Sequence, residues 1–91
     1  MNHMKIKGEY VLREIMGETV AVPIGETVVN SNVLVLLNET GTFFWNLLIK
    51  GASQSEIISS VCSEYETDEE TVKADLQEFI TYLKANNVDV E

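Results

Sequence analysis

Cysteine, histidine, proline and basic residues are scarce in this sequence. Its 91 residues include one cysteine (Cys62), one histidine (His3), one proline and six lysines or arginines. A lone cysteine can form no internal disulfide and offers no metal framework. A lone histidine near the start of the chain has no fixed partner with which to act as a general base. We therefore predict a protein that is not an enzyme, with no catalytic residue, no metal site and no cofactor.

Long apolar runs are also missing. No run approaches the roughly 20 residues of a membrane-crossing helix, and the first residues lack the apolar region of a secretory signal. The sequence thus predicts a cytoplasmic protein with no membrane partner. Hydrophobic residues make up 45% of the chain and charged residues 23%, which is typical of one small folded domain. We expect a flexible N-terminus at residues 1–7 and a single domain at residues 8–91.

Negative charge dominates the second half of the chain. The formal net charge is -9, and residues 51–91 hold ten acids against two bases, Lys73 and Lys84. Nucleic acid and anionic membrane surfaces attract basic patches, so neither is a predicted partner. Acidic surface usually serves solubility, and a docking surface for a basic partner is the less favoured alternative.

Three apolar runs in the first half indicate strands, at residues 10–16, 18–24 and 33–37. Gly17-Glu18 suits a tight hairpin turn between the first two, and Gly25 with Asn30-Ser31-Asn32 predicts a break before the third. The third run has no charge, proline or glycine and is apolar on both faces. Such a strand is either central and covered on both sides, or an edge strand left open for a peptide. The residues alone leave these two alternatives open.

Helical periodicity begins after Asn38. Asn38 is the expected N-cap of a first helix that Gly51 ends, and Ser53 with Glu56 forms a capping box for a second. The pattern from Thr67 to Glu70 predicts a third helix that ends near residue 86. Strands followed by helices imply an α+β fold. We expect a winged-helix-like, three-stranded antiparallel sheet followed by three helices, with Cys62 and Trp45 in the core.

The segment Leu37-Asn38-Glu39-Thr40-Gly41, followed by aromatic residues, resembles the PqqD family, and residues 76–83 fit its last helix. The resemblance spans about residues 8–88. It implies a RiPP recognition element, which binds the leader of a ribosomally made precursor peptide and presents it to a modifying enzyme, often a radical SAM enzyme. The leader lies as an added strand beside the third strand, in a groove bordered by the third helix.

Carried onto this chain, the resemblance implies the peptide-binding residues Val33, Leu34, Val35, Leu36, Leu37, Lys73, Gln77, Ile80 and Lys84. Lys73 and Lys84 would then face an acidic leader. An open strand also allows pairing with a second copy of the chain, so that a homodimer would compete with the peptide. The alternative is a winged-helix transcriptional regulator or an accessory protein-interaction domain, although the acidic third helix disfavours contact with DNA.

Overall fold

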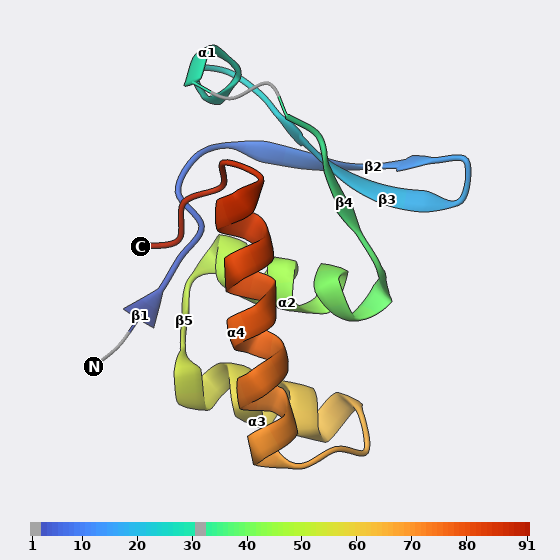
Figure 1. The fold of residues 1–91 in the computed structure, drawn as a ribbon, viewed down its shortest axis with the longest axis vertical. Helices are drawn as coiled ribbons and strands as arrows, with labels where there is room; N and C mark the ends of the chain where they lie inside the picture. The colour runs from blue at the N-terminus through green and yellow to red at the C-terminus, as the bar shows by residue number, and fades with distance from the viewer. Residues whose placement is uncertain (1–2, 31–32) are drawn as a thin grey trace.

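The computed structural model describes residues 3–30 and 33–91. In chain order its elements are β1 (His3–Met4), β2 (Tyr10–Ile15), β3 (Glu18–Pro23), α1 (Thr27–Asn30), β4 (Val35–Leu37), α2 (Glu39–Lys50), β5 (Ala52–Ser53), α3 (Gln54–Glu64) and α4 (Glu69–Ala85) (Figure 1). The predicted α+β arrangement, an antiparallel three-stranded sheet followed by three helices, is confirmed. The short helix α1 and the small strands β1 and β5 add to it. Residues 31 and 32, part of the expected break, lie outside the described residues.

The sheet has the order β2-β3-β4, so β4 is an edge strand. β2 and β3 form a hairpin in which Ile15 pairs with Glu18. The two turn residues, Met16 and Gly17, have φ values of 52° and 82°. Positive φ at both positions is the signature of a type I′ turn, whose twist matches that of the strands. The turn expected at Gly17-Glu18 is therefore wrong by one residue, because Glu18 already belongs to β3.

The two faces of the sheet differ sharply in exposure. Ala21 pairs with Val35 across β3 and β4, and both side chains are fully buried against the helices. Neighbouring residues of a strand point to opposite faces, so Leu36 points away from the core and is 49% exposed. The apolar third run therefore has one face in the core and the other in solvent. With the strand order, this shows that β4 is an edge strand and is not covered on both faces, whereas its pairing with a peptide stays a prediction.

The core lies between the sheet and helices α2, α3 and α4. Its largest fully buried side chains include Trp45, Leu48, Ile57 and Leu83, and each contributes about 1.5–3 kcal/mol by leaving water. Trp45 meets the ring of Tyr10 edge-on, with ring centroids 5.1 Å apart, and so joins α2 to β2. The predicted core position of Trp45 is confirmed, while Cys62 is half-buried and packs against the core.

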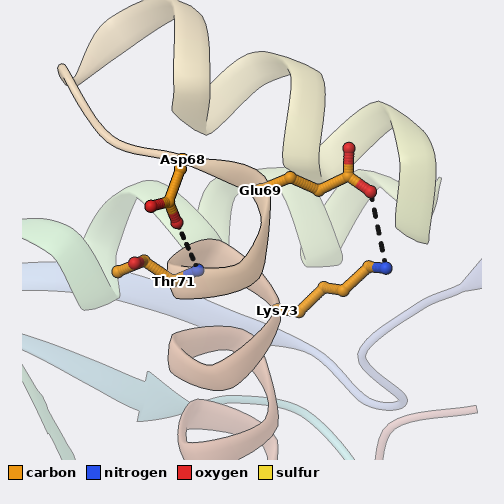
Figure 2. A network of polar contacts seen from close by, with 4 residues as sticks. All are labelled: Asp68, Glu69, Thr71 and Lys73. Carbon is orange, nitrogen blue, oxygen red and sulfur yellow. Dashed lines mark hydrogen bonds and ion pairs between the residues drawn. The ribbon is translucent and has the colours of Figure 1, made fainter.

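The helix ends follow local sequence signals. Asn38 Oδ1 accepts a hydrogen bond from the Gly41 N–H at 2.7 Å, and the capping box of Ser53 and Glu56 is complete. One cap is corrected: Asp68, not Thr67, caps α4 by accepting from the N–H of Thr71 at 2.8 Å (Figure 2). Asp is a stronger N-cap than Thr, and with Asp68 as the cap two glutamates lie in the first turn.

The start of the chain pairs with segments far along the sequence. β1 pairs with β5, and Ile6 forms an isolated bridge with Val90 and is only 2% exposed. Residues 3–7 thus contact the rest of the fold, and burying Ile6 and pairing its backbone help to offset the entropy of ordering the segment. The flexibility expected for residues 1–7 stays a prediction. Residues 1 and 2 lie outside the described residues. Within the part of the chain that the structure describes, no helix is long and apolar enough to cross a membrane.

Candidate functional site

A groove of about 640 Å³ runs between the edge strand β4 and helix α4. Residues of β3, β4, α2 and α4 line it. The buried part of the lining is apolar, with Leu37, Phe44 and Phe79 all less than 10% exposed. The full lining is Glu18, Leu36, Leu37, Asn38, Thr40, Gly41, Phe44, Asp75, Glu78, Phe79 and Tyr82. Phe44 and Phe79 form the aromatic bed of the groove, and Glu18, Asp75 and Glu78 form its acidic rim.

The edge of β4 faces this groove. The hydroxyl of Tyr82 on α4 donates a hydrogen bond to the carbonyl oxygen of Leu36 at 2.6 Å. In an extended strand the N–H and C=O of one residue point to the same side. The backbone N–H of Leu36 is thus directed away from β3 as well, towards the side on which α4 lies. The carbonyl of Leu36 is thus held by Tyr82, and the N–H of the same residue lies at the open edge of the sheet.

One flank of α4 forms the helical wall of the groove. Asp75, Glu78, Phe79 and Tyr82 have the i, i+3, i+4, i+7 spacing of residues on one side of a helix. The ring of Phe79 stacks on Phe44 of α2 with centroids 5.6 Å apart, and its centroid lies 6.4 Å from that of Tyr82. An aromatic row thus crosses from α2 to the outer end of the groove.

The Asn-Glu-Thr-Gly segment builds the junction between β4 and α2. Asn38 ends the strand and caps the helix, and the buried Gly41 lies in the first helical turn. A Cβ atom at position 41 would come within 3.0 Å of Asn38 Oδ1 and 3.2 Å of Phe79 Cε1. Glycine therefore lets α2 approach α4 closely without disturbing the cap. This is a physical reason for the motif that carried the family resemblance.

The predicted strand residues reach the site to different degrees. Leu36 and Leu37 line the groove. Val35 is fully buried in the core, whereas Leu34 is 54% exposed and Val33 is half-buried. Val35–Leu37 thus form the edge strand, and Val33 and Leu34 precede it. Contact of residues 33–37 with a peptide stays a prediction.

The predicted α4 residues lie elsewhere. None of Lys73, Gln77, Ile80 and Lys84 is part of the groove lining. At about 100° per residue, they centre on a flank about 180° from that of the groove residues, on the opposite side of the helix. Lys73 is paired with Glu69, with Nζ and Oε1 3.4 Å apart (Figure 2). The structure therefore does not bring these four residues into the groove beside β4, and their contact with a peptide stays a prediction.

Sequence reasoning missed the acidic rim. Glu18, Asp75 and Glu78 line the groove, and no lysine, arginine or histidine among the described residues does. The spacing of Asp75, Glu78, Phe79 and Tyr82 was a readable signal that they share a flank, but nothing in the sequence showed that this flank meets β4. Among residues 3–30 and 33–91, no group of three potential ligands is arranged to hold a metal ion.

The fold and groove define a class of protein: a small winged-helix-like domain with an open sheet edge beside its last helix. The model of the family described as "Coenzyme PQQ synthesis protein D (PqqD)" matches residues 18–88. The chain belongs to the PqqD family, as its sequence predicted. Since the match begins at Glu18, it includes β3, β4 and α2 to α4 but not β2.

A solved structure is also similar to this chain. It is described as TbiB1 in complex with the TbiA(beta) leader peptide, and it matches with a TM-score of 0.69 and 29% sequence identity over 91% of each chain. No curated protein matches the sequence. The similarity thus extends over nearly all of both chains and includes the β4–α4 region.

Proposed function

We propose that this protein binds the leader segment of a ribosomally made precursor peptide along β4 and presents the peptide to a modifying enzyme. The observation that carries the proposal is the uncharged edge strand β4, open towards a groove with an aromatic bed. The leader adds a fourth strand to the sheet, with its backbone paired to β4 and alternate side chains in the groove.

Strand addition explains why this edge is so little protected. Exposed edges in natural sheets are commonly blunted by charge, proline or a bulge, because an open edge pairs with other chains. β4 carries none of these, and Leu36 exposes apolar surface beside the edge. In this mode of recognition the main-chain hydrogen bonds supply affinity, and side-chain pockets supply specificity. Phe44 and Phe79 provide the apolar pocket.

Two similarities support a peptide occupant. The family description names a role in coenzyme PQQ synthesis, and the similar TbiB1 structure contains a leader peptide. We take the modifying enzyme, of the radical SAM type or another, as the partner that acts on the presented peptide. We take the protein itself to be a binding module, as its membership of the PqqD family and the leader peptide in the similar TbiB1 structure support.

A DNA-binding role is disfavoured by the same surface. The groove flank of α4 carries Asp75 and Glu78, and α4 begins with Glu69 and Glu70. DNA phosphates repel such a helix, whereas recognition helices bring basic or amide residues to the groove. No feature of the described residues favours the regulator alternative.

Amide chemical-shift titration tests the proposal. Synthetic leader segments of the precursor peptides encoded beside this gene are added to the labelled protein. We expect the largest shifts at residues 34–37 and along Asp75, Glu78, Phe79 and Tyr82. Shifts confined to the opposite side of α4, or no shift with any of these peptides, contradict strand addition at β4.

A further inference from the structure

We infer that the peptide segment held in the groove is basic, with a lysine or arginine placed against the acidic rim formed by Glu18, Asp75 and Glu78. The inference rests on the proposed function and names the chemistry of the peptide that this site selects. It also reverses the charge expected from the family resemblance, which paired an acidic leader with Lys73 and Lys84.

The carboxylates of the acidic rim come from two sides of the groove. Glu18 begins β3 at the hairpin end of the sheet, and Asp75 and Glu78 project from α4. A smaller hollow shares Glu18 with the groove and adds Glu39 to its lining. Neither lining contains a basic residue. A peptide lying along β4 therefore meets negative charge on both sides.

The bases of this chain do not neutralise that charge. Within the described ranges the single ion pair joins Lys73 to Glu69, on the other flank of α4. The carboxylates of Asp75 and Glu78 thus face the groove without an ion-pair partner from the described residues. The formal net charge of -9 adds a long-range field of the same sign. An acidic segment is repelled by this field, while a basic one is drawn towards it.

The shape of the groove favours a basic side chain next to an apolar one. Phe44 and Phe79 are buried and can receive an apolar anchor, while the carboxylates stand at the exposed rim. Lysine and arginine lay their methylene stems on apolar surface and keep the charged head at the rim. Residues two apart in a strand share a face. The recognised segment therefore has a lysine or arginine two positions from an apolar or aromatic anchor.

Charge reversal on each partner tests the inference. The first probe is a synthetic leader segment that binds the wild-type protein, compared by calorimetry with versions in which its lysines and arginines become glutamine or glutamate. The second is the double variant Asp75→Lys, Glu78→Lys. Its matched control is Glu64→Lys, Glu66→Lys, which changes the net charge equally at exposed positions outside the groove.

We expect the groove variant and the glutamate peptide each to weaken binding by about tenfold at low salt, and the control pair by less than about threefold. Raising the ionic strength should narrow these differences, since exposed charges are screened. The peptide series uses only the wild-type protein, so it still tests the inference if the double variant folds poorly.

The outcomes separate the two proposals. If leader segments bind but lose no affinity when their basic residues become glutamate, the groove does not select a basic peptide, although strand addition stands. Equal losses in the groove and control variants lead to the same conclusion, because only overall charge would then act. If no leader segment binds the wild-type protein, the proposed function fails, and this inference fails with it.

Discussion

The two flanks of α4 show how similar sequence patterns acquire different roles. One flank carries Asp75, Glu78, Phe79 and Tyr82 and forms a wall of the groove beside β4. The other carries Lys73, Gln77, Ile80 and Lys84 and does not contribute to the groove. Both sets have helical spacing, and both lie next to the buried stripe of Val72, Leu76 and Leu83. Periodicity therefore tells which residues share a flank, whereas packing decides which flank meets the sheet.

The edge strand shows the same division over three residues. Val35 and Leu37 point into the core and are nearly inaccessible, while Leu36 between them is half exposed. Substitutions at neighbouring positions of α4 or β4 should thus act on different properties: stability where the side chain is buried, and peptide binding where it borders the groove.

The largest expected effect is on the stripe that separates the two flanks. Leu83→Ala removes a fully buried side chain and should lower the free energy of unfolding by about 2–5 kcal/mol, since it leaves a cavity. Urea denaturation measures the loss. Lys84→Ala, at the next position on the exposed flank, is the control and should change stability by less than about 0.5 kcal/mol. Similar losses in the two variants would mean that the stripe is misassigned.

The second-largest expected effect is on the affinity for the leader, in a variant that keeps its fold. Leu36→Lys should weaken leader binding by about 1–3 kcal/mol, because the added strand desolvates the new charge beside the edge. Val29→Lys is the matched control, since Val29 is 85% exposed on α1 and lies outside the groove. Calorimetry with a bound leader segment gives the affinity. Unchanged affinity in a folded Leu36→Lys variant would remove β4 from the binding site.

A smaller effect is expected at the Tyr82 hydroxyl. Tyr82→Phe removes the hydrogen bond to the Leu36 carbonyl and should lower stability by about 0.5–1 kcal/mol, the low end for a partly exposed bond. The freed carbonyl can then accept from the peptide, so we expect leader affinity to hold or rise. Tyr65→Phe, in the ring pair with Phe43, is the control. A clear loss of affinity in Tyr82→Phe would show that the hydroxyl itself contacts the peptide.

The smallest effect is a pH dependence at the start of α4. Hydrogen bonds from the side chain and backbone of Thr71 lower the pKa of Asp68 from its ordinary 3.8. A lowered folded-state pKa means that the charged form is favoured by folding, so this contribution is present above pH 3.8 and is lost as pH falls through the folded value. Asp68→Asn retains the cap without the charge and should flatten the acid side of the stability profile. An unaltered profile would exclude Asp68 as a source of acid sensitivity.

Much of the architecture was predictable from local signals. The starts of two helices were predicted from Asn38 and from Ser53 with Glu56, and the end of the first helix from Gly51. Such predictions succeed because the backbone groups at a helix end find their hydrogen-bond partners within a few residues. The Asn38–Gly41 segment also carried the family resemblance. The turn at Met16-Gly17 and the cap at Asp68 were each missed by one residue, since adjacent residues can serve the same local geometry.

The sequence by itself determined the three strands of the main sheet, the three long helices, their order, the family and the excess of negative charge, because these depend on composition and short-range spacing. The tertiary structure alone decided that β4 is at the edge, that residues 3–7 join the fold, and that the acidic flank of α4, not the basic one, borders the groove. These outcomes depend on contacts between distant segments, such as Ile6 with Val90 and Tyr82 with Leu36. No local pattern encodes which of the two flanks of a helix will pack beside the sheet.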